Sequence, residues 1–523
     1  MNRRGTWLYA LAALAAFFGA ARLQPTLLQM RRTYHLTQAD PVENMPPLVA
    51  FTTVALGGFR GLIVDALWMR ATRLQDEGKY FELVQLAGWI TKLQPRFASI
   101  WAFHAWNLAY NISVMMPAPE DRWRWVRHGI TLLRDEGLRY NPGSAQLYRE
   151  LAWLFSHKIG QDMDQAHFYY KRAWAIEMSR ALGGARPDFD VLAQAPPSLA
   201  DLRSDPALEA LLAELEAAGF APPFDRVLDA PSPPPPLAAR PPDDPAVTAL
   251  WAHLRARRLR EVYKLDPLRM KEVDGQYGPL DWRLHQAQAI YWAYLGLPYA
   301  RAQYDRLSLE RAIFQGMADA FLRGRLAAPP EDGPFALTPN LALYPKVHAA
   351  YEDALRQFPA DDSVQTAFRN FLTDAVMIHY SYNHETRARE IYEELRRRFP
   401  GPDLTGDFES FVYRTWTEFA RDVDPRHAAA VVESALYQSH FWQGMNDPDQ
   451  AAGFARLARL VWQRYMEERQ DPEFRERTGL PPLEEMDRLA RERVREALEA
   501  ARSGRREVRT DPQRPFMPSR SPE

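Results

Sequence analysis

Apolar residues recur at steps of three and four along most of the chain, the spacing that places side chains on one face of an α-helix. The stretch EGKYFELVQLAGWITKLQPRF, residues 77–97, shows this pattern between a turn signal at Gly78 and a closing proline at Pro95. Alternation typical of a β-strand is sustained only near Val49–Leu56. The pattern therefore predicts an all-α protein.

The quoted stretch is the second half of a predicted helical hairpin. A first helix is expected over Leu62–Gln75, Gly78 turns the chain, and a second helix begins at Tyr80 and ends before Pro95. This arrangement resembles the tetratricopeptide repeat (TPR), a hairpin of about 34 residues whose pattern ends in proline. The resemblance implies a TPR-like α-solenoid, in which stacked hairpins bury a continuous core.

Two further units complete a predicted TPR-like repeat array over residues 46–180. The second unit has Trp101, Ala105 and Leu108 in its first helix and an expanded loop before its second helix. The third unit reads SAQLYRELAWLFSHKIGQDMDQAHFYYKRAWAIEM, residues 144–178. Three units are enough for stacked hairpins to share a core.

Residues 181–245 interrupt the helical pattern. They contain the proline-rich run SPPPPLAARPPDDP (232–245), a composition that predicts a semi-rigid or disordered linker. One short amphipathic segment, Asp205–Ala218, is expected to dock on the solenoid.

Helical periodicity then resumes to the end of the chain. A second, degenerate helical repeat array is predicted over 246–400, where Pro359 and Pro400 end two similar helices 41 residues apart. Further C-terminal helices are expected over 401–501. The tail 502–523 has few apolar residues and is predicted to be disordered.

The N-terminal sequence predicts attachment to a membrane. Arg3 and Arg4 precede an uncharged run of 17 residues, from Gly5 to Ala21, and Arg22 closes it. This pattern predicts a signal anchor or transmembrane helix over 1–24, with a cleaved signal peptide as the alternative. The leading arginines favour a cytoplasmic N-terminus and an extracytoplasmic bulk. Because the alanine- and arginine-rich sequence is typical of bacteria, the expected location is the bacterial inner membrane, as a single-pass protein.

The composition and motifs of the chain exclude several kinds of catalytic and metal site. The chain has no cysteine, which excludes disulfides, cysteine nucleophiles and cysteine-ligated metal centres. Its 65 basic and 67 acidic residues give a net charge of −2, so no nucleic-acid partner is expected. The sequence has no phosphate-binding loop, dinucleotide fingerprint or nucleophile elbow, and His379 and His384 are five residues apart rather than four. No cofactor, metal site or catalytic residue is predicted.

Five residues are candidates for a partner-binding groove: Trp68, Trp106, Tyr110, Arg149 and Trp153. In the TPR register that the resemblance implies, Trp68, Trp106, Arg149 and Trp153 fall on first helices, at positions facing the concave groove. Large aromatic residues and arginine are typical of interface hot spots. The resemblance therefore implies a membrane-anchored scaffold that binds protein partners or peptide segments, in an oligomeric state that the sequence leaves open. Packing of the tryptophans between units is the alternative.

An enzymatic function is the second hypothesis. All-helical toroidal hydrolases and lyases acting on sugars line their centres with aromatic and acidic residues. The stretch YGPLDWRLHQAQAIYW (277–292) offers Asp281, Trp282, His285 and Tyr291 for such a site. Alternatively, Asp281 caps a helix that starts at Trp282 and the rings pack between helices. The scaffold is favoured, because solenoids present extended surfaces without dedicated chemistry.

Overall fold

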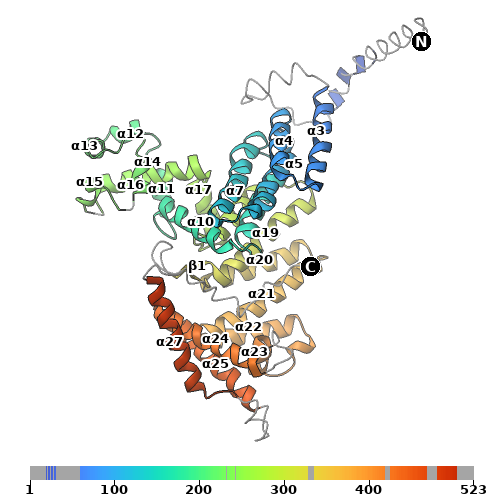
Figure 1. Ribbon diagram of the computed structural model, residues 1–523, viewed down its shortest axis with the longest axis vertical. Helices are drawn as coiled ribbons and strands as arrows, with labels where there is room; N and C mark the ends of the chain where they lie inside the picture. The colour runs from blue at the N-terminus through green and yellow to red at the C-terminus, as the bar shows by residue number, and fades with distance from the viewer. Residues whose placement is uncertain are drawn as a thin grey trace. The chain divides into compact units, whose positions relative to one another are not determined.

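A computed structural model describes residues 59–230, 232–241, 243–327, 335–417, 425–467 and 480–502, with scattered positions between 19 and 30 (Figure 1). The chain divides into two compact units, Met1–Met69 and Arg70–Glu523. Among the described residues the regular structure is helical except for one antiparallel pair of strands, β1 (Arg325–Leu326) and β2 (Leu337–Thr338). The predicted all-α class is confirmed.

The first region consists of α-helices, three of which continue directly into short π-helical segments. Its first two helices occupy the predicted positions along the sequence, and Gly78 makes the turn between them at a positive φ of 70°. The elements are α3 (Phe59–Asp76), α4 (Tyr80–Leu93), α5 (Ala98–Trp106), η1 (Asn107–Ile112), α6 (Ser113–Met115), α7 (Pro119–Thr131), η2 (Leu132–Gly137), α8 (Leu138–Tyr140), α9 (Ala145–Trp153), η3 (Leu154–Ile159) and α10 (His167–Leu182).

Two segments of this region are copies of each other in length and form. In each, nine α-helical residues (α5 and α9) are followed by six π-helical residues (η1 and η3). Hydrogen bonds join Ser99 to Gln146 over 3.1 Å and Tyr110 to His157 over 3.0 Å, and both pairs are 47 residues apart. The two segments therefore lie side by side in the same direction. Their spacing of 47 residues exceeds the 34 or so of the repeat that the sequence resembles.

In the described residues of 181–245, the segment predicted to be a proline-rich linker, the structure has five helices. The prolines that lie within these helices do not prevent this, because they occupy first turns, where a helix needs no backbone N–H. Pro206 begins such a helix, and the carboxylate of Asp205 caps it by accepting a hydrogen bond from the Ala207 N–H. The helices are α11 (Phe189–Gln194), α12 (Leu199–Arg203), α13 (Pro206–Ala217), α14 (Asp225–Asp229) and α15 (Pro235–Ala238).

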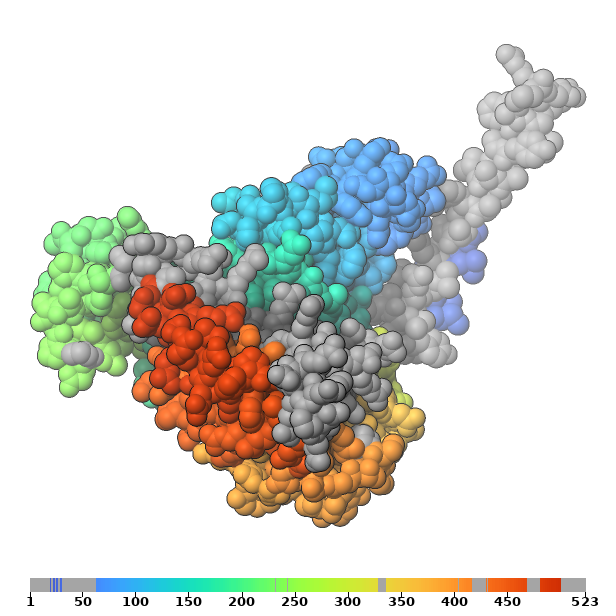
Figure 2. Space-filling model, turned by 60° about the horizontal axis from the view of Figure 1, so that its bottom comes forward, coloured from blue at the N-terminus to red at the C-terminus, as the bar shows by residue number. Residues whose placement is uncertain are grey.

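Helices α12 to α15 share a separate hydrophobic core with α16, whereas Phe189 and Leu192 of α11 belong to the main core. Leucines of α12 and α13 pack with Phe224 and with Leu250 and Leu254 of α16. Figure 2 shows the group in green as a distinct lobe. The predicted amphipathic segment Asp205–Ala218 therefore contributes the centre of this core, as α13.

The next region extends from α16 to α22. Helix α18 packs against α9 and α19, and α21 packs against α20 and α22. His348 hydrogen bonds to Glu394, and Glu352 to Arg398, so helices 46 residues apart again run in the same direction. The elements are α16 (Pro245–Arg258), η4 (Leu259–Tyr263), α17 (Pro267–Tyr277), α18 (His285–Gly296), η5 (Leu297–Tyr299), α19 (Gln303–Arg323), η6 (Leu341–Leu343), α20 (Tyr344–Gln357), α21 (Asp362–Ser381) and α22 (Glu385–Arg398).

The last region is a helical group that Figure 1 shows in orange and red. Helix α24 packs against both α25 and α27, and His440 hydrogen bonds to Asp487, 47 residues further on. Gly453 of α25 lies directly against the backbone of Ser381 in α21. The elements are η7 (Pro402–Leu404), α23 (Phe408–Thr417), α24 (Pro425–Gly444), α25 (Pro448–Glu467) and α27 (Leu483–Arg502).

Within the described ranges, no helix has the length and apolar character needed to cross a membrane. The predicted anchor over 1–24 lies outside the described residues except at a few positions. The expected strand-like region Val49–Leu56 and the tail beyond Arg502 also lie outside them.

Candidate functional site

Four aromatic rings from α5–η1 and α9–η3 form a continuous series, which we call the aromatic ladder: Trp106, Tyr110, His157 and Trp153. The Trp106 and Tyr110 rings stack with centroids 5.2 Å apart, and the His157 and Trp153 rings stack at 4.3 Å. Tyr110 and His157 join the two pairs, with centroids 5.8 Å apart and a 3.0 Å hydrogen bond between the hydroxyl and Nδ1. The ladder thus crosses from one helix to its neighbour.

The ladder arises from the repeated α-to-π transition. Each tryptophan is the last residue of its α-helix, and its stacking partner comes four residues later, inside the π-helical segment. Residues four apart lie on the same side of a helix, so each pair can stack. Short π-helical segments within α-helices are frequent at functional sites, because they change the direction of side chains locally.

A buried ion pair between Lys158 and Asp164 packs against the Tyr110 ring of the ladder. The Lys158 ammonium lies 5.2 Å from the centre of the Tyr110 ring and donates to the Asp164 carboxylate over 2.6 Å. The same carboxylate accepts hydrogen bonds from Arg122 at 3.0 Å and from the Tyr170 hydroxyl at 2.9 Å. Burial alone would raise the pKa of Asp164, but these partners, with Lys158 foremost, lower it to about 2. The carboxylate is therefore charged at neutral pH and keeps Lys158 in place.

The ladder itself carries no net charge at neutral pH. Burial raises the pKa of the Tyr110 hydroxyl, so the phenol keeps its proton. Burial and the nearby charge of Lys158 lower the pKa of His157, so its imidazole is neutral. The two indoles are the accessible part, because Trp106 is 40% exposed and Trp153 45% exposed. An uncharged ligand with apolar surface matches these rings best.

Three of the five predicted groove residues, Trp106, Tyr110 and Trp153, are brought together in the ladder. Arg149 lies one turn before Trp153 on α9, and its guanidinium contacts Asp305 at 3.4 Å and the Tyr304 ring at 5.7 Å. The fifth residue, Trp68, is on α3 within the unit Met1–Met69 and is 36% exposed.

The sequence prediction missed His157, which joins the two halves of the ladder. The signal for it was the recurrence of WNLAYNI (106–112) as WLFSHKI (153–159), which places Tyr110 and His157 at equivalent positions. The prediction also missed Lys158 and Asp164, whose pairing depends on the fold of the loop before α10.

The residues considered for a sugar-acting enzyme are all buried, and each has a partner within the chain. Trp282 is fully buried and donates to Asp274 over 3.1 Å, and the Tyr291 hydroxyl accepts from the Asp266 N–H over 3.0 Å. The neighbouring helix α18 begins at His285 rather than at Trp282.

The expectation that Asp281 caps a helix at Trp282 differs from the structure. Its carboxylate forms an ion pair with Arg283 at 2.7 Å and accepts a hydrogen bond from the Leu326 N–H of β1. The Asp281 side chain therefore fixes the start of the small β-ladder. His285, which is also buried, lies 3.4 Å from the Asp319 carboxylate.

A second buried polar cluster lies beside the loop that precedes α10. The Lys171 ammonium lies 2.7 Å from the Asp162 carboxylate and 2.9 Å from His167 Nδ1. Burial and the charge of Arg323 lower the pKa of Lys171 to about 8. These charges compensate one another, so the cluster ties the loop to α10 and α19.

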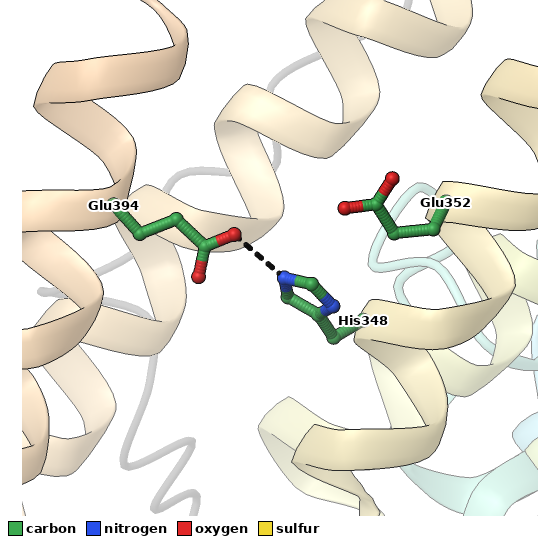
Figure 3. A group of neighbouring side chains, drawn as sticks. All are labelled: His348, Glu352 and Glu394. Carbon is green, nitrogen blue, oxygen red and sulfur yellow. Dashed lines mark hydrogen bonds and ion pairs between the residues drawn. The ribbon is translucent and has the colours of Figure 1, made fainter.

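One group of described side chains has the geometry to hold a metal ion: His348 and Glu352 of α20 with Glu394 of α22 (Figure 3). Their ligand atoms all lie within 4.8 Å of one another. Sequence reasoning missed this group, because Glu394 follows Glu352 by 42 residues and only the fold brings them together.

No protein-family model, curated protein sequence or solved structure matches this chain. Function is therefore inferred from the geometry of its own side chains.

Proposed function

We propose that this protein is a membrane-anchored scaffold of TPR-like helical repeats that binds an extended peptide segment of a partner protein on the aromatic ladder. The observation that carries the proposal is the pair of half-exposed indoles, Trp106 and Trp153, held in fixed orientation by Tyr110 and His157. Rigid, exposed tryptophan and tyrosine side chains are typical of the few residues that dominate binding energy at protein interfaces.

Charge compensation around the ladder supports an uncharged ligand. The ammonium of Lys158 is paired with Asp164, and the guanidinium of Arg149 is paired with Glu150 and Asp305. A ligand with a terminal carboxylate or a phosphate would find no uncompensated cation among these side chains. An extended segment with apolar side chains or prolines fits better, because aromatic-lined grooves bind such segments through ring contacts.

Parallel neighbouring helices also support the proposal. The α5–η1 and α9–η3 segments run in the same direction and repeat after 47 residues, and α20 and α22 do so after 46. Helical repeats stacked in this way create long surfaces suited to extended ligands. The TPR-like solenoid and the anchor over 1–24 belong to the same proposal.

The membrane part has a separate test. The full chain, expressed in a bacterial host, should remain in the membrane fraction after alkaline extraction, and deletion of residues 1–24 should release it. Reporter enzymes fused to the C-terminus should be active only on the extracytoplasmic side. Recovery of the full chain as a soluble protein would contradict the anchor.

The binding part is tested with defined peptides. Peptides selected from a random displayed library on the detergent-solubilised full chain should share one apolar or proline-containing motif. The double variant Trp106→Ala, Trp153→Ala should weaken the best peptide by at least about tenfold, since each hot-spot indole contributes on the order of 1 kcal/mol or more.

Trp89→Ala is the matched control, because Trp89 is 51% exposed but lies on α4 rather than on the helices of the ladder. It should leave the peptide affinity unchanged. If the double variant is folded by circular dichroism and still binds the selected peptide with wild-type affinity, the ladder is not the binding surface.

A further inference from the structure

The His348, Glu352 and Glu394 group offers one nitrogen and two carboxylate ligands at a single point between α20 and α22. His348 Nε2 lies 2.8 Å from the Glu394 carboxylate, and the three ligand atoms lie within 4.8 Å of one another. Figure 3 shows the imidazole and both carboxylates pointing toward one another from two helices. All three side chains are half-buried.

The two helices present these groups in a fixed way. His348 and Glu352 are four residues apart on α20 and so lie on the same side of that helix. Phe368 of α21 packs edge-on against the imidazole at 5.2 Å, and Tyr344 contacts the ring from one turn earlier at 5.9 Å. A ligand imidazole needs this kind of support, because its ring plane must point at the ion.

The ligand set matches a borderline divalent cation such as Zn²⁺. Zinc binds imidazole nitrogen and carboxylate oxygen at about 2.0–2.2 Å, which places tetrahedral ligands roughly 3.3 Å apart. His348 and Glu394 are already within that separation, and the remaining ligand atom needs to move by about 1.5 Å at most. Calcium and magnesium prefer oxygen ligands alone and fit less well.

A surface pocket adjoins the group. Its volume is about 310 Å³, and its lining includes His348 and Glu394 together with Tyr344, Arg387 and Glu390. A zinc ion with three protein ligands retains a fourth position for water or a small ligand, and that position would face this pocket.

Arg398 compensates the two carboxylates without a metal ion. Its guanidinium forms an ion pair with Glu352 and another with Glu394, the latter at 2.8 Å, while it lies over the Phe368 ring at 5.4 Å. A bound cation therefore competes with Arg398 for these two carboxylates.

We propose that His348, Glu352 and Glu394 form a binding site for one Zn²⁺-like divalent cation, with an exchangeable position open to the adjoining pocket. The site does not depend on the aromatic ladder. It makes Arg398 a regulator of metal affinity rather than only a structural partner of the two glutamates.

The test uses zinc alone and the full chain after removal of metals. Titration calorimetry should detect one zinc ion per chain. Glu394→Gln and Glu352→Gln should each weaken binding by at least about tenfold, because each loses a charged ligand. Arg398→Met should strengthen binding by at least about threefold, because the competing cation is removed.

Glu390→Gln is the matched control, because Glu390 lies one turn before Glu394 on α22, lines the same pocket and pairs with Arg387. It should change zinc affinity by less than about twofold. The proposal is wrong if the wild-type chain binds no zinc below about 1 mM, or if Glu394→Gln binds zinc as tightly as Glu390→Gln. It is also wrong if Arg398→Met, once shown to be folded, binds zinc no more tightly than the wild type. This variant keeps all three ligands, so it still tests the proposal if the glutamine variants unfold.

Discussion

Because the imidazole of His104 is buried, we expect the folded protein to lose stability in mild acid. His104 lies on α5 with only 6% of its surface exposed, and among the described residues neither ring nitrogen has a hydrogen-bond partner. Burial, followed by the charge of His128, lowers the pKa of the imidazole from 6.5 to about 4. The folded protein therefore holds His104 neutral at a pH where the unfolded chain would protonate it. The substitution His104→Leu removes this titration and fills the same space with an apolar side chain of similar volume.

The sign follows from the order of the two pKa values. Below pH 6.5 the unfolded state takes up a proton that the folded state takes up only near pH 4, so acid favours unfolding. Each pKa unit corresponds to about 1.4 kcal/mol. Between about pH 7.5 and about pH 5, the wild type should lose about 2 kcal/mol more stability than His104→Leu in the part of the chain that unfolds with α5. By pH 4 the difference approaches about 3 kcal/mol.

The stability of the region around α5 should be measured separately, because a chain of 523 residues unfolds region by region rather than all at once. Amide hydrogen exchange of peptides from α4 and α5, corrected for the intrinsic pH dependence, gives the opening free energy of that part. His128→Gln serves as the control and should keep most of the wild-type pH dependence, because His128 is exposed. If the wild type and His104→Leu show the same change in opening free energy between the two pH values, the imidazole is not held neutral by burial.

Three further substitutions test the packing and the charged clusters. Gly453→Ala should destabilise the contact of α25 with α21 by about 3 kcal/mol, because the new methyl group would overlap the Ser381 carbonyl oxygen; calorimetric melting measures the loss. Asp164→Asn should cost about 3–5 kcal/mol by leaving Lys158 buried beside a neutral partner, and an unchanged melting temperature would contradict the buried pair. Lys171 has a folded pKa of about 8 against 10.5 when free, so stability should rise as pH increases from 8 toward 10.5, and Lys171→Met should abolish that rise in thermal melts.

Helix ends could be predicted where a glycine or a proline lies close to them in the sequence. The second helix of the first hairpin was expected to begin at Tyr80, after its turn glycine, and to end before Pro95, and α4 is observed from Tyr80 to Leu93. Glycine and proline act within a few residues, so their effect can be read without knowing the fold. The same reasoning overvalued proline in 181–245. There Pro206 and Pro235 start helices, because nearby leucines provide a core that makes those helices stable.

The π-helical segments were not predictable from periodicity. A π turn adds one residue to a helical turn and is stabilised by its packing, so no local composition marks it. The stripe of apolar residues remains close to helical and hides the change. Trp106, Tyr110 and Trp153 were named from their sequence positions, while His157, the ring that connects them in the ladder, was not recognised.

Both candidate sites depend on the same long-range feature, the contact between helices 46 or 47 residues apart. It pairs Tyr110 with His157 in the aromatic ladder and His348 with Glu394 in the proposed metal site. A repeat unit of about 34 residues places neither pair together, because it shifts one helix relative to its neighbour by more than three turns. Alignment of the chain with itself at a spacing of 47 would have matched Trp106 with Trp153 and Pro95 with Pro142. The information for the ladder was therefore present in the sequence at that spacing. The metal site was not marked in this way, because its imidazole and carboxylates differ in kind and only the parallel packing of α20 and α22 brings them together.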